Sequence, residues 1–495
     1  MALLCQAQNF SKNYAVLSDI DSGVKVLPYK TGYLIQFFGQ DNSSQNDYYL
    51  GLIETDSKGE LIQKTIFDSL MADPVILVEN DKVTLASSFN HYPPYVKKTY
   101  LIQTDPSGLI TKQNVINFNT GFHFTKKLEK VDNHYYITDL INYYGDNFNT
   151  HTWTSDSIKI VVFDSSFQYQ KTINCQFVIP IFYHASTTIH DNNFIVCAFS
   201  EQDTLDAKMK YIVLAFDSSG NEKWKYTTNQ NVSPFDKVAI ETLGYNNKST
   251  AILMPYENDT VIFTQQYIVK LDSIGLKDWA YYDSNNLQEG KQELASIFKT
   301  KDENIIAVGQ QDFVSKDDNR RTGVILKLDK NGTLKWKRRV WDINTPFGHS
   351  GFNGGIELGD GSLLITGWWR DTLPDPYFDT NVWLIKLDSN GCYNPGCTGD
   401  DVVASQHNII VLSKDLLKIS PNPAHNQLQC SWTNTPSEAR YISVFDMNGV
   451  EIIKKSVTGK TGNISIDISN VPAGVYLVKL FGDKWGSWPE KLVKE

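Results

Sequence analysis

Apolar and polar residues alternate along most of the chain with the two-residue period of half-buried β-strands. An aspartate ends an apolar run seven times, and successive aspartates lie 49 to 59 residues apart. Six of them begin a D-x-x-G turn, and the third has Phe167 in place of the glycine. This regular spacing indicates an internal structural repeat. The aspartates are Asp56, Asp105, Asp164, Asp217, Asp272, Asp329 and Asp388.

Each copy of the repeat predicts four strands. One alternating segment precedes the aspartate turn and another follows it. Further upstream, a second tight turn opens another strand, and we assign such turns at Asn80, Asp132, Asn258 and Asp360. Four strands in a unit of about 50 residues are typical of a β-propeller blade. In three copies the seventh residue after the aspartate is a tryptophan, at Trp224, Trp279 and Trp336.

A single four-stranded sheet of this length cannot bury both of its apolar faces, so the units are expected to close into a ring. We therefore predict an all-β chain in which residues 8–397 form a seven-bladed β-propeller. The last copy lacks a clear outer strand, because Cys392 begins a turn that contains Pro395. A strand within residues 8–17 is expected to take that place and to join the two ends of the ring.

The repeated aspartates are interpreted as turn residues that cap hairpins with their side-chain oxygens. A calcium ion takes six to eight oxygen ligands, and one carboxylate per turn falls far short of that number. The nine histidines show no spacing of metal ligands on a recognisable element. We therefore expect no metal and no cofactor.

The composition agrees with sheets throughout, because the 495 residues include 25 Tyr, 25 Phe and 11 Trp. A net charge of -10 argues against a nucleic-acid partner, whose phosphates would be repelled. No run of 18 apolar residues occurs, so no transmembrane helix is predicted. Residues 1–7 have the small-x-small form of the end of a signal peptide, although an ordinary disordered tail stays open.

Two pairs of cysteines attract attention. Cys392 and Cys397 enclose a turn, and we favour a local disulfide there over a metal site, because no His or second Cys pair stands nearby in the sequence. Cys175 and Cys197 fall in apolar runs and are interpreted as packed core thiols.

Except in the fifth copy, the connections between the second and third strands of the blades are long, and they are expected to lie on one face, where recognition residues usually gather. Two of them carry aromatic rings beside charged groups, a combination that can stack on a sugar and form hydrogen bonds with it. The alternative is that these aromatic residues pack the loops onto the blades. The candidates in the first loop are Tyr143, Tyr144, His151 and Trp153, and those in the second are Trp369, Arg370, Asp371, Asp375 and Tyr377.

The last eighty residues form a separate unit in the sequence. Alternating runs separated by turns predict a small immunoglobulin-like β-sandwich over residues 412–495, after a linker at 398–411. Pro421, Asn422 and Pro423 precede its first long strand, and Gly449 closes a predicted hairpin turn. A further motif contains Pro472, Ala473, Gly474 and Tyr476.

These three motifs, in this order, resemble the type A C-terminal sorting domain of the type IX secretion system of Bacteroidetes-type bacteria. The resemblance implies that the chain is exported, that the secretion machinery is a partner, and that the protein works outside the cell or on its surface. Copies six and seven, above all residues 355–367, resemble bacterial extracellular propeller repeats of the PQQ-like or kelch-like kind. On strand pattern alone, a terminal binding domain is an alternative for residues 412–495.

The sequence contains no H-E-x-x-H, G-x-S-x-G or P-loop motif. We therefore predict a non-catalytic binding module for an extracellular glycan or protein ligand. The alternative is a glycoside- or polysaccharide-active enzyme that uses the loop-rich face, since a pair of carboxylates on separate loops leaves no sequence spacing to find.

Overall fold

The structure is a computed structural model, and its described part is all β-strand and turn, without a helix. No helix in this part is long and apolar enough to span a bilayer. The described residues are 9–15, 20–41, 47–67, 72–91, 96–105, 110–117, 122–144, 153–191, 194–202, 209–228, 240–256, 265–282, 292–312, 321–342, 349–370, 380–394, 396–397, 401–404, 407–410, 416–433, 435, 438–446, 451–482, 487 and 490–495.

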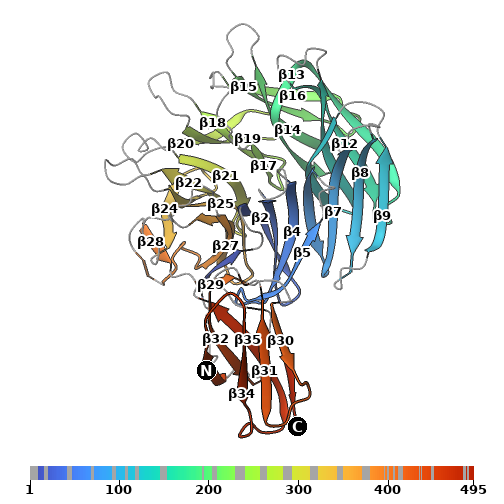
Figure 1. The fold of residues 1–495 in the computed structure, drawn as a ribbon. Coiled ribbons are helices and arrows are strands. Elements are labelled where there is room, and N and C mark those ends of the chain that lie inside the picture. Colours follow the sequence, from blue (N-terminus) through green and yellow to red (C-terminus); the bar gives the residue numbers. More distant parts are fainter. Residues whose placement is uncertain are drawn as a thin grey trace, which may run out of the picture.

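Antiparallel four-stranded units follow one another through the first three quarters of the chain, and Figure 1 shows them arranged around a common axis. The first units comprise β2 (Ile20–Tyr29), β3 (Gly32–Asp41), β4 (Asp47–Thr55) and β5 (Leu61–Phe67), then β6 (Ala72–Glu79), β7 (Lys82–His91), β8 (Val96–Thr104) and β9 (Ile110–Asn117), then β10 (Phe122–Val131), β11 (His134–Tyr144), β12 (Trp153–Asp164) and β13 (Tyr169–Asp191).

Strand β13 belongs to two units, because its first half pairs with β12 and its second half pairs with β14. The later units continue with β14 (Phe194–Gln202), β15 (Met209–Phe216) and β16 (Glu222–Thr227), then β17 (Glu241–Gly244), β18 (Thr250–Tyr256), β19 (Gln265–Leu271) and β20 (Lys277–Tyr282), then β21 (Gln292–Lys299), β22 (Ile305–Asp312), β23 (Arg321–Leu328) and β24 (Leu334–Asp342), then β25 (His349–Glu357), β26 (Leu363–Arg370) and β27 (Thr380–Leu387).

The ring closes at its innermost strands. Each first strand contacts the first strand of the next unit, in the order β2, β6, β10, the second half of β13, β17, β21 and β25, and β25 in turn contacts β2. The hydrophobic clusters lie between consecutive units rather than inside one sheet. Ile158 and Ile195, for example, share one cluster although they belong to neighbouring units. This packing explains why no unit is expected to be stable alone.

A strand from the start of the chain completes the last unit, as the sequence predicted. Strand β1 (Phe10–Ala15) pairs antiparallel with β27, and Phe10 and Tyr14 are buried between the last unit and the first. The Tyr14 hydroxyl donates a hydrogen bond to the Gly59 carbonyl over 2.6 Å, and Lys12 forms an ion pair with Glu60. The two ends of the ring are therefore fastened by side chains as well as by strand pairing.

Two features differ from the sequence predictions. The turn that opens the second strand of the fifth unit spans Tyr245 to Ser249, where the Tyr245 amide donates to the Ser249 carbonyl. Asn258, which was assigned to that turn, lies outside the described residues, in the connection from β18 to β19. The predicted linker at 398–411 contains two short strands, β28 (Asp401–Ala404) and β29 (His407–Ile410), which pair in parallel with the outer edges of β24 and β1.

The turn aspartates cap their hairpins, as expected. In six copies one carboxylate oxygen accepts hydrogen bonds from the amides two and four residues later, as Asp329 does from Asn331 and Thr333. The amide of Thr333, with help from Lys335, holds the pKa of the Asp329 carboxyl below its usual range. The seventh, Asp105, precedes residues that the structure does not describe.

The glycine of the turn and the tryptophan of the preceding copy form one contact between units. Trp279 donates its indole N–H to the Lys330 carbonyl over 2.9 Å, and its ring covers Gly332. Trp224 repeats this arrangement on the turn that contains Gly275. Both glycines have positive φ, so both the backbone and the neighbouring ring favour a residue without a Cβ.

Replacing Gly332 with alanine is expected to destabilise the propeller by at least about 1–2 kcal/mol, the cost of a left-handed conformation in a residue with a Cβ. A Cβ there would also lie 2.6 Å from the Trp279 ring and would displace it. Denaturant unfolding measures the effect. Gly359→Ala is the matched control, because its Cβ would meet nothing within 4 Å, and a change of equal size in both variants would contradict the proposed contact.

In the third copy a large residue, instead of glycine, occupies the turn. Phe167 has a φ of 65° and is almost fully buried against Tyr135, with ring centroids 5.1 Å apart. The preceding copy has Lys112 at the tryptophan position, and its ammonium group lies 5.6 Å from the Phe167 ring centre. A large residue in the turn is therefore matched by a flexible residue in the neighbouring copy.

The C-terminal unit consists of two sheets that share one core, and Figure 1 shows it below the propeller. Leu428 from one sheet and Ile442 from the other are both fully buried in this core. One sheet contains β30 (Leu417–Ser420), β31 (Gln427–Trp432) and β34 (Gly462–Asp467), and the other contains β33 (Glu451–Ser456), β32 (Ala439–Phe445), β35 (Gly474–Gly482) and β36 (Glu490–Lys494).

Candidate functional site

The first group of predicted ligand residues lies at the loop ends of β11 and β12. The register pairs Tyr143 with Thr154 and Tyr144 with Trp153, so three aromatic residues lie close together on the backbone of one hairpin. His151 belongs to the connection between these strands and lies outside the described residues. The hairpin therefore brings three of the four predicted residues to one place in the ring.

The second group lies at the end of β26. Arg370 is the last residue of this strand and is paired with His349 of β25 and Thr380 of β27. The Trp369 side chain is 4% exposed and packs in the core between the last two units, so its ring offers no face to a ligand. This burial corrects the prediction for Trp369 and agrees with the packing alternative. The remaining predicted residues, Asp371, Asp375 and Tyr377, lie outside the described part of the chain.

A further group of polar residues, which the sequence did not predict, surrounds the axis of the ring. We call it the axial cluster, and it consists of Lys25 on β2, Lys127 and Glu129 on β10, and Glu241 on β17. The inner strands present one backbone edge to the axis, and the polar groups of such an edge need partners. Side chains of the cluster supply several of these partners.

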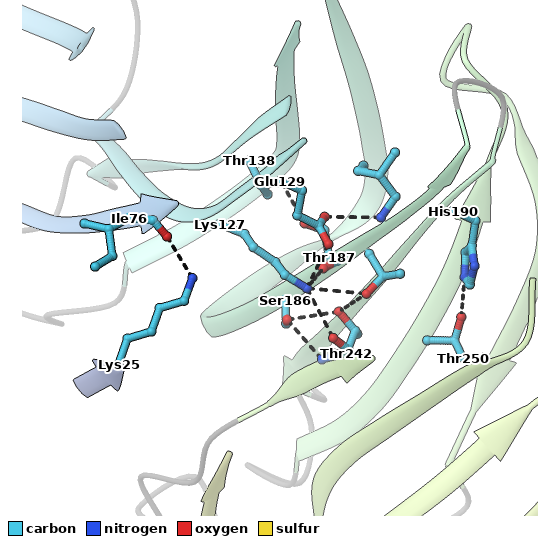
Figure 2. Close-up of polar contacts among 12 residues, drawn as sticks. Lys25, Ile76, Lys127, Glu129, Thr138, Ser186, Thr187, His190, Thr242 and Thr250 are labelled. Carbon is cyan, nitrogen blue, oxygen red and sulfur yellow. Dashed lines mark hydrogen bonds and ion pairs between the residues drawn. The ribbon is translucent and has the colours of Figure 1, made fainter. Parts of the chain in front are cut away.

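Three members of the axial cluster each hold the backbone of the next inner strand. Lys25 donates to the Ile76 carbonyl over 2.8 Å, as Figure 2 shows. The Glu129 carboxylate accepts a hydrogen bond from the Ile189 amide over 3.2 Å. The Glu241 carboxylate accepts one from the Ile297 amide over 2.7 Å. A side chain of one unit thus fixes the edge of the following unit at three points of the ring.

Lys127 connects three inner strands at once. Its ammonium group donates to the carbonyls of Thr187 and Thr242, which belong to β13 and β17, and lies 3.2 Å from a carboxylate oxygen of Glu129 on its own strand. Beside it, Thr242 forms hydrogen bonds with Ser186 (Figure 2) and with the Thr188 hydroxyl, so the two strands are linked directly as well as through Lys127. The ammonium charge is therefore held by a carboxylate and two carbonyl dipoles.

Burial is the main cause of the pKa shifts of Lys25 and Glu241 in the axial cluster. Burial lowers the pKa of Lys25, and the nearby positive charge of Lys127 lowers it further, while Glu241 and Glu129 oppose this shift. Burial raises the pKa of Glu241, against the hydrogen bond from the Ile297 amide and the charges of Lys127 and Lys25. Two lysines and two glutamates balance one another in formal charge, which offsets part of the cost of burying charged groups.

Local strand geometry places the two lysines. Lys25 and Lys127 are each the sixth residue of an inner strand, and each directly follows a β-bulge in the pairing with the second strand. A bulge turns the side chains that follow it. Comparison of the repeats position by position could have found this pair, but no local motif marks either residue.

Lys127→Met is expected to destabilise the protein by about 1–3 kcal/mol, because two backbone carbonyls and a carboxylate lose their common donor. Urea unfolding measures the change. Lys277→Met on the outer strand β20 is the control, since Lys277 is exposed and its substitution is expected to stay within about 0.5 kcal/mol. Equal stability of the two variants would show that Lys127 does not join the inner strands.

The described residues contain no group of three or more His, Cys, Asp or Glu side chains placed to hold a metal ion. Cys392 and Cys397 form a disulfide at the end of the propeller, beside the Asn9 side chain, which donates to the Cys392 and Tyr393 carbonyls. This turn therefore helps to hold the start of β1.

The C-terminal motif residues surround the last strand. Asn422 donates its amide to the Lys491 carbonyl and accepts a hydrogen bond from the Val493 amide, which fixes one edge of β36. The other edge of β36 pairs with β35, where Gly474 lies opposite Lys494. Pro421 and Pro423 flank Asn422 and follow cis peptide bonds. Pro472 and Ala473 are exposed, and the Tyr476 hydroxyl donates to the Pro472 carbonyl. Gly449 lies outside the described residues.

Comparison with known families identifies this unit. Residues 418–495 match the family of secretion system C-terminal sorting domains. The domain indicates export through the type IX secretion system to the cell surface or the extracellular space. The type IX machinery is accordingly a partner of the chain. No curated protein matches the chain.

Several solved structures resemble the chain at low similarity. The β-propeller domain of the Trilobed protease from Pyrococcus furiosus has 10% identity and a TM-score of 0.42, over 77% of this chain and 95% of that one. A polysaccharide lyase has 10% identity and a TM-score of 0.42, over 74% and 90%. The WD40 domain of Toxoplasma gondii coronin has 9% identity and a TM-score of 0.43, over 77% and 86%. These values are too low to carry over any activity.

Proposed function

We propose that the protein is an exported, non-catalytic binding module, in which a seven-bladed β-propeller carries the ligand site and an immunoglobulin-like sandwich carries the export signal. Support for seven blades comes from the closed succession of inner strands, each of which begins one four-stranded unit. Support for the sandwich comes from two sheets that share one core. Residues 8–397 and 412–495 are the proposed limits of the two parts.

The aromatic hairpin end of β11 and β12 carries the proposal for ligand binding. Tyr144 and Trp153 lie opposite each other in the strand register, and Tyr143 precedes Tyr144 on the same strand. Aromatic rings provide large contact surfaces at low cost in conformational entropy. Arg370, at the same end of its own blade, adds a planar group with five N–H donors. This chemistry suits a glycan, whose rings stack on aromatic faces and whose hydroxyls accept and donate hydrogen bonds.

The axial cluster supports a binding role over a catalytic one. A catalytic acid or base must reach a substrate proton. Glu129 and Glu241 instead hold backbone amides of neighbouring strands, and Lys25 and Lys127 hold carbonyls. These four charged groups therefore act to keep the ring rigid, which is what a preorganised binding surface requires.

Binding of the exported protein to an array of extracellular polysaccharides tests this function. We expect the parent to bind a subset of glycans and Trp153→Ala to weaken that binding about tenfold, which is ~1.4 kcal/mol. Tyr282→Ala is the control, since this exposed tyrosine lies on the outer strand β20. Absence of glycan binding in the parent, or equal binding by Trp153→Ala, would contradict the glycan site. Turnover of a polysaccharide that is lost in Asp371→Asn or Asp375→Asn would favour an enzyme instead.

A further inference from the structure

Two cysteines meet at the interface between two neighbouring blades. Cys175 lies in the first half of β13, which is the outer strand of one blade, and Cys197 lies in β14 of the next. Both are free cysteines whose side chains are fully buried in the hydrophobic cluster that joins these blades, and the Cys175 thiol is near enough to contribute to the raised pKa of Cys197. The two thiols therefore share one buried interface although 22 residues separate them along the chain.

The compartment in which this protein works favours oxidation of such a pair. Residues 418–495 direct export, and exported bacterial proteins pass through the oxidising periplasm, where disulfides form and persist. The chain already holds one disulfide, between Cys392 and Cys397. Cys430, the other buried free cysteine of the described residues, lies in the core of the sorting domain, far from this pair along the chain.

We propose that Cys175 and Cys197 are joined by a disulfide in the exported protein and that this bond clamps the two blades together. The sulfur–sulfur bond forms as each thiol gives up one hydrogen. The two electrons and two protons pass to the disulfide of a periplasmic dithiol–disulfide oxidant, which is reduced to two thiols. The cysteine pair is thereby a modification site that is reduced in the cytoplasm and oxidised in the periplasm.

The bond forms while the blades assemble. Thiol–disulfide exchange requires a thiolate that an oxidant can reach. In the folded protein, burial raises the pKa of the Cys197 thiol, and the neighbouring Cys175 thiol raises it further. The folded interface thus suppresses the thiolate and shields both sulfurs. Oxidation therefore precedes the closing of the interface, and burial then protects the bond from reductants.

Mapping of free thiols in the exported protein tests the proposal. The protein is collected from the medium or the cell surface, unfolded in guanidinium chloride with iodoacetamide and without reductant, digested, and analysed by mass spectrometry. We expect a cross-linked peptide pair that contains Cys175 and Cys197, while Cys430 is alkylated. Cys392 and Cys397 should stay linked and unalkylated, which shows that existing disulfides survive the procedure.

Two further samples make the result unambiguous. The same chain produced in a reducing cytoplasm should carry alkyl groups on both Cys175 and Cys197. Exported Cys197→Ala should carry one on Cys175, because its partner is gone. Alkylation of both cysteines in the exported parent, with Cys392 and Cys397 still linked, would overturn the proposal. Linkage of Cys175 to any cysteine other than Cys197 would overturn it as well.

Discussion

A chain that lacks residues 8–17 is expected to melt at least about 10 °C below the full chain. Strand β1 is the outer strand of the last blade, so its loss reopens the ring at β27. Phe10 and Tyr14 are buried between the last unit and the first, and loss of one large aromatic core side chain costs about 3–5 kcal/mol. For domains of 150–250 residues each kcal/mol corresponds to about 2–4 °C. Differential scanning calorimetry measures the shift.

Two further chains separate ring closure from loss of the terminus. A chain that begins at Asn9 keeps β1 and should melt with the parent. Tyr14→Phe removes only the hydroxyl that bonds the Gly59 carbonyl, and its cost should be about 1 kcal/mol. An unchanged melting temperature after deletion of residues 8–17 would mean that β1 does not close the ring.

Local pattern was sufficient to predict most strands of the propeller. Strands β4, β8, β12, β15, β19, β23 and β27 each end at the expected aspartate turn, because alternation and turn chemistry point to the same place. The fifth copy contains two turn-like stretches, around Asn247 and Asn258, and the sequence prediction assigned the turn to the second. The structure uses the first, where the Asn247 side chain bonds Ser249 and Lys248 takes a positive φ.

The short strands β28 and β29 could not be read from the sequence, for a physical reason. Each has four residues and pairs with a strand distant in sequence, β24 or β1. Outer strands of blades leave backbone groups unpaired, and the chain that leaves the propeller covers two such edges on its way to the sorting domain. A segment of this length becomes a strand through its partner and not through its own pattern.

The candidate site residues were harder to predict from the sequence than the strands, because contacts between distant segments decide where these side chains lie. The sequence predicted Tyr144 and Trp153 for one loop, and the structure places them at the paired ends of the two strands that flank it. The axial cluster joins Lys25 to Glu241 across 216 positions, and only ring closure brings them together. Trp369 was misread because β26 is buried on both faces almost to its end, so an aromatic residue there is part of the core.

Removal of residues 490–495 is expected to reduce export to background. This segment contains β36 (Glu490–Lys494), and Leu492 is fully buried in the core that the two sheets of the sorting domain share. The strand is also held by β35 on one side and by Asn422 and Ala424 on the other. Its loss opens the core and leaves the edges of both neighbours without partners, so the secretion machinery no longer meets a folded sorting domain.

Immunoblots of medium, cell surface and cell lysate measure the exported fraction. Lys491→Ala is the matched control, because this exposed residue lies on the same strand and its backbone bonds are kept. Asn422→Ala removes both side-chain bonds to β36 without touching the core, and it should lower export several-fold while the propeller keeps its melting temperature. Export of the truncated chain at the parent level would show that the machinery reads the sorting domain without its last strand, and the motif residues would then act by direct contact rather than by fixing β36.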